Sequence, residues 1–182
     1  MAEEKLVLDS SVEAFIKALR TRLTPAAKER LKALDMDPDK KLKSTYAFDA
    51  WNNAILAMRE ELFPSLPPSE GFRKLGELFI DGYRETIVGK TVMTLAKLLG
   101  VRKTLGRMTQ NFRSANNYSE TRLEQKGPTH YELWVNEVGP FPDFTAGILV
   151  AGLRAVGAQD LSVKPNGYDG HSVTYRVEWK EA

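Results

Sequence analysis

The chain has 182 residues, 26 basic and 24 acidic side chains, and no cysteine. Without cysteine there is no disulfide framework, thiolate nucleophile or zinc ribbon, and two histidines are too few for a multi-histidine metal centre. A formal net charge of +2 gives no indication of a nucleic-acid-binding surface. This length fits one domain with its own hydrophobic core, so we expect a single domain over residues 1–182.

Neither a secretory signal nor a membrane span is indicated by the apolar segments. Leu6–Leu8 is too short for the core of a signal peptide. The longest apolar stretch, residues 147–153, ends at Arg154, whereas a span needs roughly 20 such residues. We therefore expect a cytoplasmic protein.

Helical periodicity runs through residues 1–116. Apolar residues between 12 and 19 recur at i, i+3, i+4 and i+7, with Ser10 or Ser11 as a candidate cap. Thr24-Pro25 has the pattern of an N-cap and first helical residue. Further helices are predicted from about Ser44 or Thr45 to Leu62, from Ser69 to Tyr83, over 91–99 and from about 103 to 112, with the proline-rich segment 63–68 as a stiff connector.

Strand periodicity appears in residues 117–182. Apolar and polar residues alternate in 130–138 and 172–180, the segments 118–125 and 160–164 are extended, and 144–156 forms an apolar helix. The order β-β-α-β-β predicts an α+β fold, in which a helical N-terminal half precedes an antiparallel sheet with one packed helix. Small residues on that helix, among them Gly147 and Gly152, permit close approach to the sheet or to another subunit, and both readings stay open.

No catalytic motif is complete. Gly89-Lys90-Thr91 resembles the end of a phosphate-binding loop, but Arg84 stands where that pattern requires its first glycine. His130 and His171 both flank turns, where exposed side chains are the rule, and neither belongs to a Ser/His/Asp arrangement. We expect no catalytic residue, no cofactor and no metal; an enzyme with His130 or Lys90 as acid or base is the lowest-ranked alternative.

Two sets of side chains are candidates for binding. Large side chains that would line a small-molecule pocket, or else only form core, are Trp51, Phe79, Tyr83, Met108, Phe112 and Tyr118. Basic side chains that would face an anionic ligand or acidic partner, or else only solvent, are Lys90, Arg102, Lys103, Arg107 and Arg113. Lys103 and Arg107 are four residues apart and would share one face of a helix.

Several segments occur in an order that identifies a family better than an activity. They are Tyr83-Arg84-Glu85-Thr86-Ile87-Val88-Gly89-Lys90, Leu98-Leu99-Gly100-Val101-Arg102-Lys103-Thr104-Leu105, Asn117-Tyr118, and Gly147-Ile148-Leu149 with Gly157-Ala158. In these the chain resembles, over nearly its whole length, a myxobacterial paralogous family of small proteins with no established function.

More remotely, the order of elements resembles that of the haem nitric-oxide-binding domain, the four-vinyl-reductase ligand domain and the small subunits of vesicle-tethering particles. The haem-binding branch implies a histidine ligand on a helix before the sheet, and the tethering branch implies an acylated cysteine. The stretch 95–117 contains no histidine and the chain contains no cysteine, so we expect neither feature.

The leading hypothesis from the sequence is a non-enzymatic signalling or assembly module that acts through protein contacts, with an unidentified protein partner or a second copy of itself. The alternative is a sensor domain that binds a small apolar molecule in a pocket between the helices and the sheet, without haem.

Overall fold

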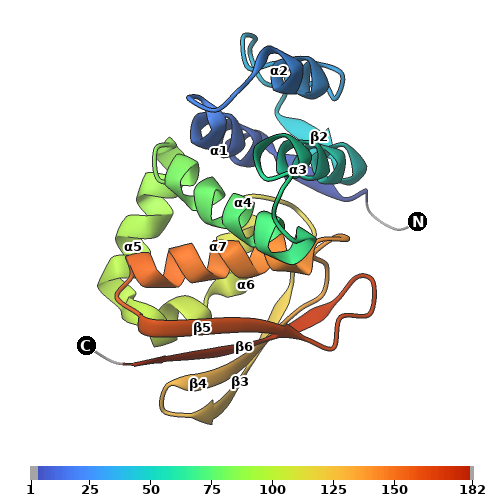
Figure 1. Ribbon diagram of the computed structural model, residues 1–182. Coiled ribbons are helices and arrows are strands. Elements are labelled where there is room, and N and C mark those ends of the chain that lie inside the picture. Colours follow the sequence, from blue (N-terminus) through green and yellow to red (C-terminus); the bar gives the residue numbers. More distant parts are fainter. Residues whose placement is uncertain (1–3, 181–182) are drawn as a thin grey trace.

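Helices occupy most of the first part of the chain, and an antiparallel sheet with one helix forms the second part (Figure 1). A computed structural model describes residues 4–180. The helices are α1 (Asp9–Leu19), α2 (Pro25–Lys32), α3 (Phe48–Leu62), α4 (Pro68–Tyr83), α5 (Ile87–Leu105), α6 (Met108–Arg113) and α7 (Pro142–Ala155). The strands are β1 (Leu6–Leu8), β2 (Thr45–Ala47), β3 (Thr121–Gly127), β4 (His130–Val135), β5 (Gln159–Asn166) and β6 (Val173–Lys180). The predicted α+β class is confirmed.

The main sheet has the order β3-β4-β6-β5, and all of its neighbouring strands are antiparallel. Leu133 pairs with Tyr175 and Val135 with Val173, so the apolar positions of β4 and β6 meet on one face. These four side chains are buried, whereas the intervening residues are more exposed. The predicted order β-β-α-β-β is therefore confirmed, and the alternation correctly identifies the inner face.

Helix α7 lies between the sheet and α4 (Figure 1). A Cβ atom added to Gly147 would stand 2.0 Å from the carbonyl oxygen of Arg73, and one added to Gly76 would stand 2.0 Å from that of Phe144. The two backbones thus approach each other where each helix has a glycine. The close approach that Gly147 permits is to another helix of the same chain, not to the sheet or to a second subunit.

A two-stranded sheet of β1 and β2 is absent from our sequence prediction. Its strands pair antiparallel, with Val7 opposite Tyr46. Residues 45–47 are therefore extended, and the helix predicted from Ser44 or Thr45 begins only at Phe48. Three-residue strands are too short to produce a recognisable alternation.

Of the two helix N-caps predicted from the sequence, the structure confirms one. The prediction for Ser10 and Ser11 is wrong, because their hydroxyls donate to the carbonyl oxygens of Ser114 (3.1 Å) and Ala115 (3.0 Å) and so tie α1 to the segment after α6. The prediction for Thr24 is confirmed: its Oγ1 accepts a hydrogen bond from the Ala27 amide at 3.1 Å.

The segment from α5 to α6 is broken twice. Gly100 has φ of +74°, a left-handed conformation that favours glycine, and it interrupts α5. A turn at Gly106 and Arg107 then separates α5 from α6, so the helix predicted from about 103 to 112 is divided into two. Lys103 and Arg107 consequently do not share a helix face. Among the helices of residues 4–180, none is long and apolar enough to cross a membrane.

Candidate functional site: an apolar cavity between the helices and the sheet

A cavity of about 140 Å³ lies between the helices and the main sheet. Five helices, α3 to α7, contribute side chains to its wall, together with residues of β1, α1 and the end of β4. On α7 the lining residues Thr145, Ile148, Leu149 and Gly152 have the spacing of one helix face. The volume is close to the ~150 Å³ of an engineered apolar cavity that takes up benzene or xenon.

The wall contains all six side chains that the sequence nominates for a pocket. Trp51 comes from α3, Phe79 and Tyr83 from α4, Met108 and Phe112 from α6, and Tyr118 from the segment before β3. Trp51 packs edge-to-face on Phe79, with ring centroids 6.0 Å apart, and Phe79 stacks on Tyr83 at 6.0 Å. These rings belong to the hydrophobic core and at the same time line the cavity.

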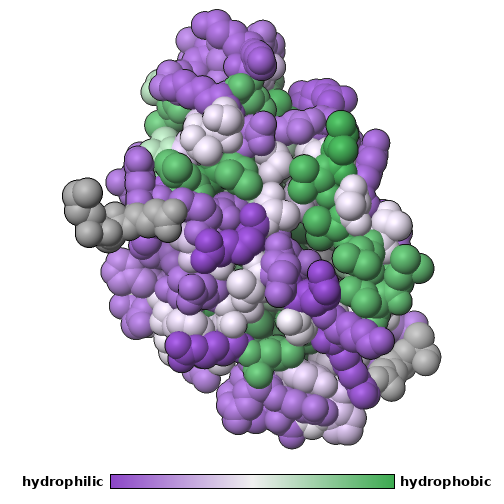
Figure 2. All heavy atoms as spheres, turned by 180° about the vertical axis from the view of Figure 1, so that it is seen from behind, coloured by the Kyte–Doolittle hydropathy of each residue, from purple (hydrophilic) through white to green (hydrophobic). Residues whose placement is uncertain are grey.

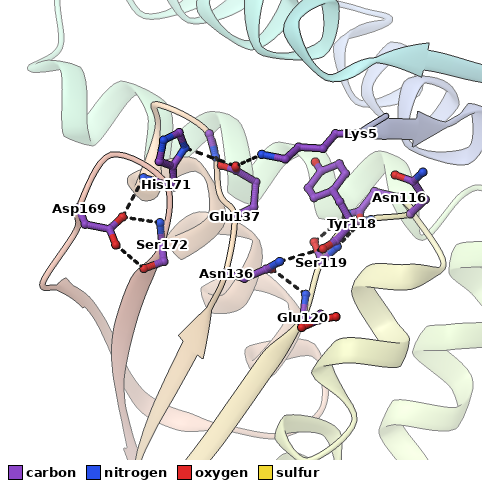
Figure 3. A network of polar contacts seen from close by, with 12 residues as sticks. Lys5, Asn116, Tyr118, Ser119, Glu120, Asn136, Glu137, Asp169, His171 and Ser172 are labelled. Atoms are coloured by element: carbon purple, nitrogen blue, oxygen red, sulfur yellow. Dashed lines mark hydrogen bonds and ion pairs between the residues drawn. The ribbon is translucent and has the colours of Figure 1, made fainter. Parts of the chain in front are cut away.

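A polar cluster on this wall centres on the carboxylate of Glu137, which is only 5% exposed. One of its oxygens accepts from the Lys5 ammonium group and lies 3.5 Å from Nδ1 of His171; the other accepts from the Gly139 amide at 2.9 Å (Figure 3). A buried charge requires such partners, because leaving water costs it several kcal/mol. Glu137 therefore joins the chain before β1 to the end of β4 and to the β5–β6 loop.

The segment that carries Tyr118 is held by two asparagines (Figure 3). Asn116 Oδ1 accepts from the amides of Tyr118 (3.1 Å) and Ser119 (2.9 Å). Asn136 Nδ2 donates to the Tyr118 carbonyl at 2.9 Å, and its Oδ1 accepts from the Glu120 amide at 2.7 Å. The backbone around Tyr118 is thus fixed from both sides.

The two tyrosines of the wall are protonated phenols. Burial raises the pKa of Tyr118, and the charge of Glu137 raises it further. Burial also raises the pKa of Tyr83, against the opposing effect of its hydrogen bond with Ser114 Oγ at 2.9 Å. The Tyr118 hydroxyl forms no hydrogen bond within residues 4–180.

The five basic candidates do not form one set. Lys90, Arg102, Lys103 and Arg107 are exposed on α5 and the turn after it. Arg113 instead stabilises the next loop: it donates to the carbonyl oxygens of Asn117 and Ser119 and lies 3.7 Å from Glu120. These contacts hold Arg113 against the loop before β3, while its side chain remains 43% exposed.

Both histidines lie outside the cavity wall. His130 begins β4 and has its Nδ1 3.9 Å from Glu178, and His171 stands on the β5–β6 loop with its side chain 78% exposed. Across the described part of the chain, no group of three or more His, Cys, Asp or Glu side chains is arranged to hold a metal ion.

Glu137 is the site residue that our sequence reasoning missed. The alternation that places Tyr131, Leu133 and Val135 on the inner face also assigns position 137 to that face. A carboxylate on the buried side of a strand is a signal of a satisfied polar site, since such groups are almost never left unpaired. This signal was present in the sequence.

Solved structures similar to this one include H-NOX domains. An oxygen-binding H-NOX domain related to soluble guanylate cyclases, in its oxygen complex, has a TM-score of 0.66 and 17% identity, over 93% of each chain. The Fe(II) unliganded H-NOX protein from K. algicida has a TM-score of 0.64 and 9% identity, over 94% of this chain and 96% of that one. A mutant of the H-NOX protein from T. tengcongensis has a TM-score of 0.59 and 15% identity, over 93% and 96%. At these identities the likeness establishes the fold alone.

The family assignment rests on the sequence itself. No curated protein matches this chain. A family model described as "Protein of unknown function (DUF2378)" matches residues 5–180, which covers every element of the fold. The chain therefore belongs to the DUF2378 family.

Proposed function

We propose that the chain is a sensor-type domain that binds a small, mostly apolar molecule in the cavity between the helices and the sheet, without haem. The observation that carries the proposal is the cavity itself, which combines an aromatic and aliphatic wall with a phenol that has no partner among the described residues. Ligand sites in proteins are typically apolar spaces with a few oriented polar groups. The H-NOX-like fold supports the proposal by analogy.

Haem is a poor match for the residues of this wall. Haem proteins hold iron through histidine, cysteine, methionine or tyrosine, and neither histidine lines the cavity. Tyrosine binds iron as a phenolate, a form that the raised pKa values of Tyr83 and Tyr118 disfavour. The thioethers of Met93 and Met108 are the remaining candidate iron ligands on this wall. The cavity is close in volume to one that takes up benzene, which is much smaller than haem.

The sequence favours protein contacts over ligand binding. The six large side chains line one common space, and this supports ligand binding as the first proposal. We also propose that binding is not followed by catalysis. Lys90 and His130, the two residues considered as acid or base, both lie outside the cavity wall.

A variant that fills the cavity tests the proposal. Gly152 lines the cavity, and a Cβ added there would meet no atom within 4 Å. Toluene, an apolar probe near the size of benzene, should raise the melting temperature of the native chain by mass action. Gly152→Leu should melt at least as high as the native chain without toluene but lose most of the toluene shift, whereas Gly152→Ala should keep it. If toluene leaves the melting temperature of the native chain unchanged, the cavity does not bind small apolar molecules.

Haem is tested separately by titrating the purified chain with haemin. We expect no saturable Soret band and no change in melting temperature. A stoichiometric band that disappears in a Met93→Leu/Met108→Leu variant would contradict the haem-free proposal and leave the toluene result untouched. Native mass spectrometry of the chain purified gently from its host would then identify the resident molecule by its added mass.

A further inference from the structure

The outer face of α5 is apolar where a surface helix ordinarily carries charge. Ile87 is 84% exposed and Leu98 82%, and Val88 and Leu95 on the same helix are also exposed. Ile87, Thr91, Leu95 and Leu98 follow one another at helical spacing and form a stripe about 16 Å long at 1.5 Å per residue. Figure 2 shows hydrophobic atoms gathered on the side of the molecule where α5 lies.

The two threonines on this face of α5 do not make it polar. Thr91 Oγ1 donates to the Ile87 carbonyl at 3.1 Å, and Thr94 Oγ1 donates to the Lys90 carbonyl at 2.7 Å. Both hydroxyls thus bond to the helix itself. The opposite face, with Gly89, Met93 and Ala96, is buried, so the apolar residues of the stripe are not a misplaced part of the core.

Charge along the segment that carries the stripe has one sign. Residues 86–119 contain six Lys and Arg and no Asp or Glu, in a chain whose formal net charge is only +2. Lys90 and Lys97 are seven residues apart, so they lie on the same flank of α5, and both are exposed. The nearest acidic residue along the chain, Glu85, has its carboxylate 4.0 Å from Arg20. A surface of this kind attracts an anionic partner.

We infer that α5 is a docking surface for an anionic lipid bilayer, with Ile87, Leu95 and Leu98 inserted at the interface and Lys90 and Lys97 at the headgroups. Interfacial helices lie flat in this way, and lysine stems extend along the apolar layer while their ammonium groups reach the phosphates. A second copy of the chain would bring two basic surfaces together. A protein partner would need a groove shaped to both Ile87 and Leu98, whereas a bilayer accepts them at any position.

Vesicle sedimentation tests this inference with the full chain. We expect binding to phosphatidylcholine vesicles that contain about a third phosphatidylglycerol, little binding to pure phosphatidylcholine, and release when salt is raised to about 0.5 M. Ile87→Asn/Leu98→Asn should lower the partition coefficient at least about tenfold through lost apolar burial. Lys90→Gln/Lys97→Gln should lower it about tenfold or more, because each lysine near the surface contributes electrostatic attraction.

Matched control variants distinguish the contribution of the α5 face from that of the overall charge and hydrophobicity of the chain. Lys41→Gln/Lys74→Gln removes one exposed lysine from the loop before β2 and one from α4, and Leu56→Asn removes an exposed apolar residue from α3; both variants should bind like the native chain. All these positions are exposed, so unchanged melting temperatures should accompany the binding results.

Three outcomes would overturn the inference. The first is native chain that stays in the supernatant with anionic vesicles at low salt, including the case in which it binds a glutamate-rich amphipathic peptide instead. The second is a stripe variant that binds vesicles as well as the native chain. The third is a dimer in sedimentation equilibrium that Ile87→Asn dissociates, because the stripe would then be the contact between two copies.

Discussion

Two glycines of α7, five residues apart, lie in opposite surroundings. At Gly147 the backbone of α4 is so close that one added carbon would overlap the Arg73 carbonyl at 2.0 Å. At Gly152 an added carbon would meet no atom within 4 Å, and the residue lines the cavity. One helix therefore has a tightly packed side and, one and a half turns later, a side that borders empty space.

This contrast distinguishes two walls of the site by how closely they are packed. Helix α7 is held between α4 and the sheet, so the residues it presents to the cavity have a fixed position. Helix α5 faces the cavity with Val92, Met93 and Ala96 and is interrupted at Gly100. A small molecule would therefore touch one fixed wall and one helix whose other face is the exposed apolar stripe.

The largest expected effect is a loss of stability when the close contact between α4 and α7 is disrupted. Gly147→Ala forces the α4 and α7 backbones apart, and we expect it to lower the free energy of unfolding by about 2–3 kcal/mol. Urea denaturation followed by circular dichroism measures the change. Gly76→Ala should have a similar effect, because its added carbon would meet the Phe144 carbonyl at the same 2.0 Å. An unfolding midpoint within error of the native value would show that the helices separate at no cost.

The second effect concerns two buried phenols, that of Tyr175 on β6 and that of Tyr118 on the cavity wall. Burial raises the pKa of both Tyr175 and Tyr118. The folded chain keeps these protons where the unfolded chain loses them, so the stability they contribute is complete below the unfolded pKa near 10 and is lost as pH rises above it. We expect each tyrosine to add about 1.4 kcal/mol per pH unit to that loss, measured by urea denaturation between about pH 8 and 11.

Phenylalanine variants separate the two tyrosines. Tyr175→Phe and Tyr118→Phe should each reduce the alkaline slope. At neutral pH only Tyr175→Phe should cost about 1 kcal/mol, because its hydroxyl donates to the Pro142 carbonyl at 2.7 Å, whereas the Tyr118 hydroxyl has no partner within residues 4–180. An equal cost for Tyr118→Phe would mean that this hydroxyl is bonded in the fold and is not available to a ligand.

Much of this fold and part of the candidate site can be predicted from the sequence. Alternation in β4 and β6 and periodicity in the helices depend on local spacing, which one chain displays. The six large side chains were nominated by type, and the space they surround depends on how distant helices meet, which spacing does not encode. The difference between Gly147 and Gly152 has the same origin, since their local sequences look alike. Short strands such as β1 and β2 depend wholly on a distant partner.

The smallest expected effect is a gain in stability at Gly152, where α7 borders the cavity. Gly152→Ala adds one carbon in the interior of α7 without a steric conflict and removes the backbone freedom of a helical glycine. We expect the free energy of unfolding to rise by about 0.5–1 kcal/mol, opposite in sign to the change at Gly147. Urea denaturation of the two variants side by side measures both. A loss of stability at Gly152 would mean that the space beside it is occupied, and the open side of α7 would then be part of the packed core.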